Sequence, residues 1–405
     1  MKVVYLHQYF NTPSMAGGTR SYEMARRLVS AGHEVDLVTT WRGQGRRRDW
    51  FTTEEAGIRV HWLPVPYSNS MSYRERIRAF LRFAWASARK AASLRGDVVF
   101  ATSTPLTIAV PGIYAAWRRR IPLVFEVRDM WPAVPIAIGA IRNPLLVWAA
   151  RRLEAFTYRY ASHIVALAPG MADDIVAMGV AREKLTVIPN GCDLDIFTSS
   201  AGAPSPREEF AWLGSRRLVL YAGALGRANG VGYLVRLAAE VVELDGEVRF
   251  AVIGEGAEKD AIRAAARAAG LLDRTFFMFD PVPKRDLVRW LQAADIVAAL
   301  FTGPRAIWKD AVQNKFFDAL ATGKPVANNF DGWQSRIAAE AGVGMILDPD
   351  DVRKAAEQLV AALHDDDWLD GVPTRARQLA ESEFERGLLA ARLERVLRTA
   401  VGQQL

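Results

Sequence analysis

The chain has 405 residues, 50% of them hydrophobic and 24% charged, a balance typical of a globular protein with two or three domains. One cysteine excludes a disulfide scaffold and a cysteine-rich metal site, and five scattered histidines do not indicate a metal site either. The 52 basic residues exceed the 45 acidic ones, which favours an anionic partner: nucleic acid, a phosphorylated small molecule or an anionic membrane surface.

The first half of the sequence alternates short apolar runs with amphipathic stretches. Val3–Leu6 predicts a buried strand, and Gly18–Ser30 predicts a helix. Apolar strands separated by helices pair in parallel with both sheet faces covered, so this half predicts a doubly wound α/β domain. The further strands expected here, with helices between them, are Glu34–Thr40, Ile58–Leu63, Val98–Ala101, Leu123–Val127 and Ile164–Leu167.

The pattern is interrupted at Pro189–Arg217, which is rich in Gly and Pro and is interpreted as a linker. The alternation then resumes, and the chain ends in helices. The strands expected in this half are Leu218–Ala222, Val248–Ile253, Thr275–Met278, Ile296–Ala299 and Pro325–Asn328. The expected helices are Val231–Leu244, Glu258–Ala269, Val312–Thr322, Val352–Leu363 and about Arg375–Ala400.

These patterns predict two Rossmann-like domains. The first spans residues 1–190, a linker spans 191–216 and the second domain spans 217–382. We expect the last helix, about 383–405, to pack back on the first domain. Two such domains would face each other across a cleft, which is where ligands usually bind.

Ser72–Arg95 departs from this rhythm, because its basic residues far outnumber its one acid, Glu75. Its apolar residues recur at helical spacing, which suits a helix at a membrane interface. The alternative is a core helix whose charges face water, and the lopsided charge favours the membrane. The residues expected to contact the membrane or acceptor are Arg74, Arg76, Arg78, Phe80, Arg82, Phe83 and Trp85.

Two glycine-rich turns could bind a phosphorylated ligand. Gly17 and Gly18, followed by Arg20, open the first helix, where free N–H groups attract anions. Gly254 and Glu255 follow the strand that ends at Ile253. Neither turn has the G-x-G-x-x-G fingerprint of dinucleotide sites. An ordinary strand-to-helix turn explains the first equally well. The second is a weak partial match, at the carboxyl edge of a parallel sheet where nucleotides bind in such folds.

Trp308–Pro325 is the most informative segment for chemistry. Gln313 and Asn314 lie near the start of a predicted helix, Asp310 precedes it, and Asp318 lies early within it. With Lys315 between them, the two carboxylates could hold hydroxyl groups on both sides of a bound phosphate. The alternative is that both aspartates cap the helix or compensate its dipole, and the segment alone favours this alternative.

Over essentially its full length the chain resembles glycosyltransferase family 4, the retaining nucleotide-sugar transferases of GT-B fold. The matching segments, in the order of the family, are Pro13–Gly18, Ala31–Val35, Val187–Asp193, Tyr221–Gly223, Ile253–Gly256, Ala294–Ile296 and Asp318–Pro325. Details at Gln8–Phe10, Gly18–Arg20, Phe125–Pro132 and Asn314–Asp318 are similar to the bacterial O-antigen and capsule branch, which includes N-acetylfucosamine transferases.

The resemblance implies roles for particular residues. The two acids of the family's E-x7-E motif fall on Asp310, which would contact the donor sugar, and Asp318, which would bind the ribose. Both are Asp here rather than Glu, which leaves the role of Asp310 open. The family's catalytic His-Asp falls on Arg128 and Asp129, so the histidine is replaced, and Asp129 would be the best protein base if one is used.

The phosphate-binding Arg and Lys of the family are also replaced, by Ala224 and Asn229. Since a buried diphosphate must be neutralised, Arg227, Lys315 and the helix start near Gln313 are the candidates. Whether Arg227 and Lys315 take over these roles stays open. In the front-face scheme proposed for the family, the leaving phosphate itself takes the acceptor proton.

We therefore expect an enzyme that needs no cofactor and no metal and moves a sugar from a UDP-sugar to a lipid-linked saccharide in bacterial surface polysaccharide synthesis. No apolar run is long enough for a signal peptide or a membrane span, so we expect a cytoplasmic protein, peripheral on the inner face of the cell membrane, without nucleic acid. The alternatives are a non-catalytic basic protein that binds membranes or nucleic acid, and a GT-B UDP-sugar 2-epimerase. Donor sugar, base, acceptor, linkage and oligomeric state stay open.

Overall fold

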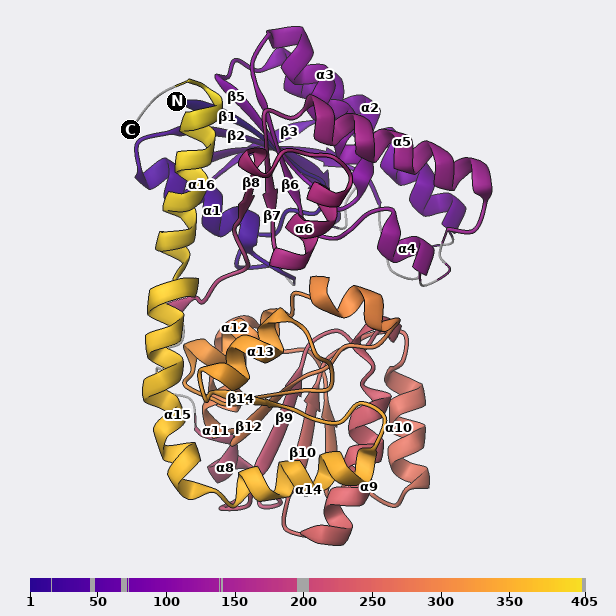
Figure 1. Ribbon diagram of the computed structural model, residues 1–405, viewed down its shortest axis with the longest axis vertical. Coiled ribbons are helices and arrows are strands. Elements are labelled where there is room, and N and C mark those ends of the chain that lie inside the picture. Colours follow the sequence, from indigo (N-terminus) through magenta and orange to yellow (C-terminus); the bar gives the residue numbers. More distant parts are fainter. Residues whose placement is uncertain are drawn as a thin grey trace. The chain divides into compact units, whose positions relative to one another are not determined.

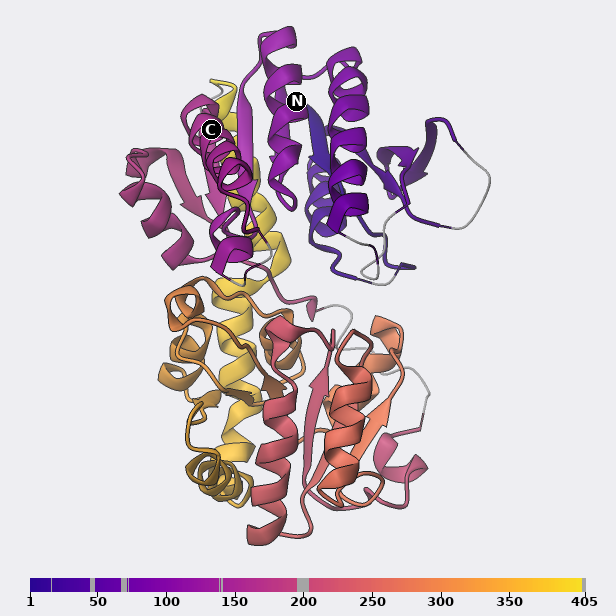
Figure 2. The ribbon, with the colours of Figure 1, turned by 90° about the vertical axis from the view of Figure 1, so that its right-hand side faces the viewer.

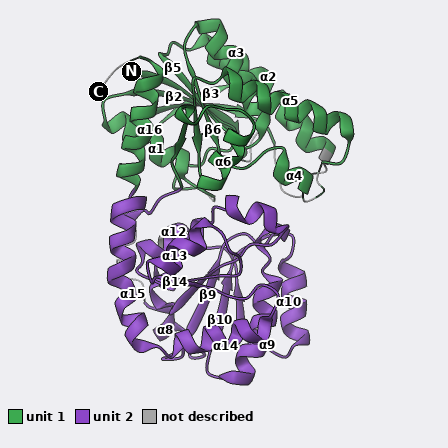
Figure 3. Ribbon diagram, viewed as in Figure 1, with its two compact units in different colours: residues 1–189, 386–405 green, residues 190–385 purple. Residues whose placement is uncertain are grey.

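The computed structural model describes residues 1–15, 17–43, 48–66, 71, 73–137, 139, 141–194 and 204–402. It divides into two compact units, one made of Met1–Pro189 with Arg386–Leu405 and the other of Asn190–Glu385 (Figure 3). Each unit has one largely parallel sheet with helices on both faces (Figures 1 and 2), which confirms the predicted α/β class.

The sheet of unit 1 has the order β3-β4-β2-β1-β5-β6-β7-β8. All neighbours are parallel except β3 and β4, and β1 pairs Val3 with Val35 on one side and with Val98 on the other. The winding reverses between β1 and β5, which makes that edge the switch point where ligands bind in such folds. Its strands are β1 (Lys2–His7), β2 (Glu34–Trp41), β3 (Phe51–Glu55), β4 (Ile58–Pro64), β5 (Val98–Thr102), β6 (Leu123–Val127), β7 (His163–Ala166) and β8 (Leu185–Val187).

Helices pack on both faces of this sheet. α1 (Arg20–Ser30) and α16 (Arg386–Ala400) cover one face, where Met24 and Leu393 join the core of Tyr5 and Phe100. The other face carries α2 (Tyr73–Ser93), α3 (Ala109–Arg119) and α5 (Pro144–Tyr160), and α2 packs along α3 (Figure 1). The remaining short elements are η1 (Leu106–Ile108), α4 (Ala133–Ala137), α6 (Pro169–Ala177) and η2 (Arg182–Lys184).

The sheet of unit 2 is parallel throughout, in the order β11-β10-β9-β12-β13-β14, so its switch point lies between β9 and β12. The strands are β9 (Leu218–Ala222), β10 (Arg249–Ile253), β11 (Phe276–Phe279), β12 (Ile296–Ala299), β13 (Val326–Asn328) and β14 (Gly344–Ile346). One face carries α9 (Gly232–Leu244), α10 (Lys259–Ala268) and α14 (Val352–Leu363). The other carries α11 (Lys284–Ala293), α12 (Asn314–Ala321), α13 (Trp333–Glu340) and α15 (Asp366–Leu379).

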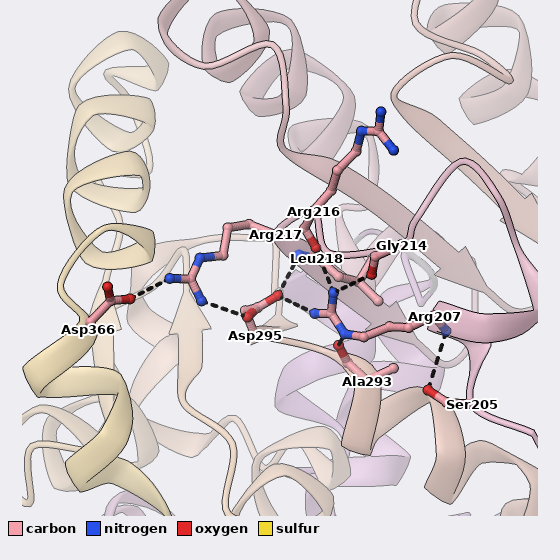
Figure 4. A network of polar contacts seen from close by, with 9 residues as sticks. All are labelled: Ser205, Arg207, Gly214, Arg216, Arg217, Leu218, Ala293, Asp295 and Asp366. Atoms are coloured by element: carbon pink, nitrogen blue, oxygen red, sulfur yellow. Dashed lines mark hydrogen bonds and ion pairs between the residues drawn. The ribbon is translucent and has the colours of Figure 1, made fainter.

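The segment predicted as a linker, 191–216, differs from the prediction, because its described residues belong to unit 2. The Arg207 guanidinium on α8 (Pro206–Glu209) donates to Asp295 Oδ2 at 2.7 Å and to the carbonyls of Ala293, Gly214 and Arg216 (Figure 4). Trp212 stacks on Phe277, with ring centroids 3.8 Å apart. Local Gly and Pro content cannot reveal this packing, since Arg207 and Asp295 are 88 residues apart.

The single C-terminal helix predicted at 375–400 is also interrupted. α15 ends at Leu379, a wider turn spans Ala380–Phe384, and α16 begins at Arg386 in unit 1. Phe384, just before the extended residue Glu385, packs against the rings of Phe316 and Phe317 in unit 2.

Candidate functional site

The start of α12 is held in place by the helix that follows it in the chain. Gln334 of α13 accepts a hydrogen bond from the Gln313 backbone N–H at 2.6 Å and donates one to its carbonyl at 3.2 Å. Asn314 accepts a hydrogen bond from Asn190 at 2.8 Å. Gln313 does not cap α12 with its side chain, so the first-turn N–H groups face no side-chain cap and can attract an anion.

Lys315 lies beside this helix start, at the switch point of the sheet. Its Nζ is 4.6 Å from the centroid of the Tyr221 ring, and the nearest polar contact is Gln313 Oε1 at 3.5 Å. Desolvation by burial lowers the pKa of Lys315 to about 8. Within the described part of the chain it forms no ion pair with a carboxylate, so its charge is available for an anionic ligand.

The turn after β9 leaves room for Lys315. Gly223 has φ +151°, and a Cβ there would lie 2.7 Å from Lys315 Cε, so a larger residue would displace the lysine. Gly254 serves the same turn, because a Cβ on it would lie 1.9 Å from the Gly223 carbonyl oxygen. Gly254 therefore allows two backbones to meet rather than lying open to a ligand. Glu255, predicted with it, is exposed and pairs with Lys259 at 2.7 Å.

Asp318 lies one turn into α12 and pairs with Lys284 Nζ at 3.3 Å. Lys284 also pairs with the buried carboxylate of Asp193. The structure thus brings together Lys315 and Asp318, as the sequence predicts, and adds Lys284 and Gln334, which no local motif indicates. Asp310, predicted in the loop before the helix, ends η4 (Arg305–Asp310), and its side chain is buried.

Arg227 begins η3 (Arg227–Asn229), in the segment between β9 and α9. It is exposed and lines a separate hollow together with Tyr233, Arg236 and Trp308. Of the two cations predicted to neutralise a diphosphate, only Lys315 thus lies at the start of α12.

In unit 1, the predicted contact residue Arg20 is occupied by structural bonds. Its guanidinium is buried, donates to Glu126 Oε1 at 2.8 Å and also bonds the carbonyls of Ile188 and Pro189. These bonds hold the guanidinium inside unit 1, and donor binding by Arg20 stays a prediction. Gly17, with φ +124°, and Gly18 pack against Asn11, which donates to the Gly18 carbonyl at 3.3 Å; Ala16 lies outside the described residues.

Arg128 and Asp129 follow β6 and are held by the loop after β5. The Arg128 backbone N–H donates to Ser103 Oγ at 3.0 Å, and Thr104 donates to Asp129 at 2.6 Å. Arg128 also donates to His7 Nε2 at 3.2 Å. The side chain of Asp129 is exposed at the carboxyl edge of the sheet, where a reacting group is accessible to a ligand.

The helix predicted at Ser72–Arg95 is present as α2, but its aromatic residues do not all face outward. Phe83 is fully buried, and Phe80 packs against Tyr9 with ring centroids 6.5 Å apart, so both belong to the packed side of the helix. Trp85 is 66% exposed. Arg76 donates to the Met71 carbonyl at 3.1 Å. The predicted residues that remain exposed are Arg74, Arg78, Arg82 and Trp85, and Ser72 lies outside the described residues.

Comparison with known proteins identifies both units. Residues 16–191 match the family described as "Glycosyl transferase 4-like domain", and residues 216–365 match "Glycosyl transferases group 1". The Anabaena protein Alr3699/HepE in complex with UDP-glucose is similar over 98% of this chain and 100% of that one, with TM-score 0.71 and 17% identity. The fold is GT-B.

Two curated relatives cover most of the chain. The D-inositol 3-phosphate glycosyltransferase of Xylanimonas cellulosilytica is 26% identical over 87% of this chain and 84% of its own. The putative colanic acid biosynthesis glycosyl transferase WcaI of Escherichia coli is 21% identical over 93% of this chain and 94% of its own. With both domain matches in order, the chain is a glycosyltransferase of the GT-B type.

Two features are absent from the described residues. No helix in them is both long and apolar enough to cross a membrane. They also contain no group of three or more His, Cys, Asp or Glu residues arranged to hold a metal ion.

Proposed function

We propose that the enzyme transfers a sugar, with retention of configuration, from a UDP-sugar to a lipid-linked saccharide in bacterial surface polysaccharide synthesis. The observation that carries the donor part is Lys315, a desolvated cation beside the uncapped start of α12. The Anabaena relative, whose structure contains UDP-glucose, supports the choice of UDP, and WcaI supports the polysaccharide setting. The branch resemblance adds an N-acetylated aminosugar as the transferred group.

In this proposal the diphosphate lies against Lys315 and the first-turn N–H groups of α12, while Asp318 accepts hydrogen bonds from the ribose. As the C1–O bond breaks, negative charge grows on the leaving phosphate and positive charge on the sugar ring. The lysine and the helix N–H groups stabilise the leaving charge, which is electrostatic catalysis. The acceptor hydroxyl oxygen bonds to C1 on the face from which the phosphate leaves, and its proton passes to the leaving phosphate, so no side-chain base is required and no metal enters these steps.

The outer sides of α2, α3 and α5 support a membrane-bound acceptor. They expose Trp85 (66%), Trp117 (64%), Trp148 (61%) and Leu145 (77%), although such side chains are normally covered in a soluble protein. Ten arginines are exposed on or directly after these helices, and the one exposed acid there is Glu75. The arginines are Arg74, Arg78, Arg82, Arg89, Arg118, Arg119, Arg120, Arg151, Arg152 and Arg159.

Aromatic residues interleaved with arginines suit the headgroup region of an anionic bilayer. Arg89 lies over the Trp85 ring at 4.8 Å, and Arg152 lies over the Trp148 ring at 5.7 Å. We therefore place the enzyme, in this proposal, on the inner face of the cell membrane, with α2, α3 and α5 toward the lipid.

A thermal-shift panel of UDP-, GDP- and dTDP-sugars tests the donor assignment, because a ligand that binds only the folded state raises its melting temperature. We expect a UDP-sugar to raise it most in the wild type and little in Lys315→Met. If no nucleotide sugar shifts the melting temperature, the donor assignment is wrong.

A further inference from the structure

The carboxyl edge of the sheet in unit 1 carries a second cationic centre that the donor site does not use. β1 ends at His7, β2 ends at Trp41 and is followed by Arg42, and β6 is followed by Arg128. β2 and β1 are neighbours and β6 lies one strand beyond β5, so these residues flank the switch point between β1 and β5. Ligands of doubly wound folds bind at such points.

The contact between Arg128 and His7 defines the state of the histidine. A guanidinium has only donors, so His7 Nε2 must accept the 3.2 Å hydrogen bond, and the ring carries its proton on Nδ1. His7 is therefore neutral in this contact. Burial, then the charges of Arg128 and Arg42, lower the pKa of His7 well below the ordinary value, which agrees with that state.

Arg128 keeps its positive charge without a carboxylate partner among the described residues. The nearest acid in sequence, Asp129, accepts instead from Thr104 at 2.6 Å. The other acid of this strand, Glu126, is bound to Arg20 at 2.8 Å and to Thr102 at 3.1 Å. The arginine is half-buried, and its immediate neighbour is a neutral imidazole.

Arg42 adds a second guanidinium to the same edge. It bonds Asn11 Oδ1 and lies over the Tyr9 ring at 5.7 Å, which fixes the side chain against unit 1. Arg42 follows β2, the strand next to β1, which itself ends at His7, and the charges of both arginines lower the pKa of His7. Two guanidinium groups around a neutral histidine form an arrangement that an anion with several oxygens would complete.

We propose that this edge of unit 1, through Arg128 and Arg42, binds a phosphoryl group of the sugar acceptor. The proposal rests on the proposed function, because it names the acceptor as an anionic molecule. His7 acts as a positioning residue: it accepts one N–H of Arg128 and leaves the other donors of the guanidinium for the ligand. The phosphoryl group is either a monoester on a soluble sugar or the diphosphate of a lipid-linked one.

The test uses the full chain saturated with UDP, so that the donor site is filled, and titrates it by calorimetry with inorganic phosphate and with pyrophosphate. We expect binding in the wild type and a loss of affinity of about tenfold or more in Arg128→Gln. Arg128→Lys should restore part of it, and His7→Phe should weaken it without removing a charge. Arg182→Gln, which removes an exposed charge from the same unit, is the matched control and should bind like the wild type.

Three outcomes would overturn the proposal. In the first, neither anion binds to the UDP-saturated wild type. In the second, a folded Arg128→Gln variant binds as well as the wild type. In the third, Lys315→Met removes the binding and Arg128→Gln does not. Stronger binding of pyrophosphate than of phosphate points to the diphosphate source, and the reverse points to a monoester. A separate UDP titration reports on the donor site alone, so a wrong donor assignment can be distinguished from a wrong assignment of the acceptor phosphoryl site.

Discussion

The ammonium group of Lys315 lies over the face of the Tyr221 ring, 4.6 Å from its centroid. A cation on an aromatic face keeps part of the stabilisation that water would give it. Burial nevertheless lowers its pKa to about 8. An anion placed against it would restore the missing electrostatic partner, which is why the donor site is proposed here.

The first prediction is a pH dependence of UDP binding. Lys315 loses its proton as the pH rises through about 8, so UDP affinity should fall between pH 7 and pH 9 in calorimetric titrations. Lys315→Met should bind UDP about tenfold or more weakly at pH 7 and should lose that dependence. A variant that keeps the wild-type pH profile would show that another group titrates.

In the ligand-free protein, Lys315 should lower the free energy of unfolding. Its folded pKa lies below the ordinary 10.5, so the unfolded chain holds the proton more tightly, and this group's contribution to stability rises with pH from about 8 to 10.5. Lys315→Met should therefore raise the melting temperature at pH 7, and its advantage over the wild type should shrink as the pH approaches 10.5. A lower melting temperature at pH 7 would contradict this.

Asp318→Ala should weaken UDP binding by about 10- to 100-fold, because it removes a charged acceptor worth about 1.5–3 kcal/mol. The fold should persist, since Lys284 keeps its ion pair with Asp193. Isothermal titration measures the effect, and Asp370→Ala, an exposed acid of the same unit, is the control. Unchanged affinity in a folded Asp318→Ala variant would exclude the ribose role.

Arg128→Ala and Asp129→Asn should lower turnover more than donor affinity, because both residues belong to unit 1, whereas the donor is assigned to unit 2. We expect kcat to fall about tenfold or more with a UDP affinity within about twofold of the wild type. Steady-state kinetics with the matching titration separates the two effects. A folded double variant with unchanged turnover would remove this loop from the active site.

Anionic vesicles should bind the protein at low salt and release it at high salt, since the contribution of each arginine is screened within a Debye length. Replacing Arg74, Arg76, Arg78 and Arg82 with Gln should reduce co-sedimentation. The double variant Trp117→Ser/Trp148→Ser should reduce co-sedimentation even at low salt. Phe83 is buried, so its substitution would test the core rather than the surface. If the wild type does not co-sediment with anionic vesicles at low salt, the proposed membrane-binding surface is wrong.

How far the sequence predicts the fold depends on how the strands are buried. Leu123–Val127 and Leu218–Ala222 coincide with β6 and β9, because interior parallel strands are continuous apolar runs. β3 and β14 escape prediction because both are only partly buried, so neither forms a buried apolar run in the sequence. Arg207 packs on Asp295 through a contact between residues far apart in the chain, which composition cannot reveal.

The site shows the same limit. Helical spacing and the Gly-Lys-Pro stop predict where α12 lies, and with it Lys315 and Asp318. Spacing does not show that Arg20 forms an ion pair with Glu126, or that Asp318 forms one with Lys284, since those partners lie on other elements. Helical spacing also places Phe83 beside the apolar stripe of its helix, but it does not show that this side chain is fully buried in the core.

The chain enters unit 2 at Asn190 and leaves it at Glu385, and the Cys192 backbone N–H donates to the Phe384 carbonyl at 2.7 Å, so the two ends of this insertion meet. Unit 2 is therefore encoded by one continuous stretch of gene and contains all six strands of its sheet. Pro189 and Arg386 are the residues of unit 1 to which the two ends of this stretch are joined. The topology therefore provides one pair of positions, on either side of Asn190–Glu385, at which the gene segment for unit 2 can be cut out.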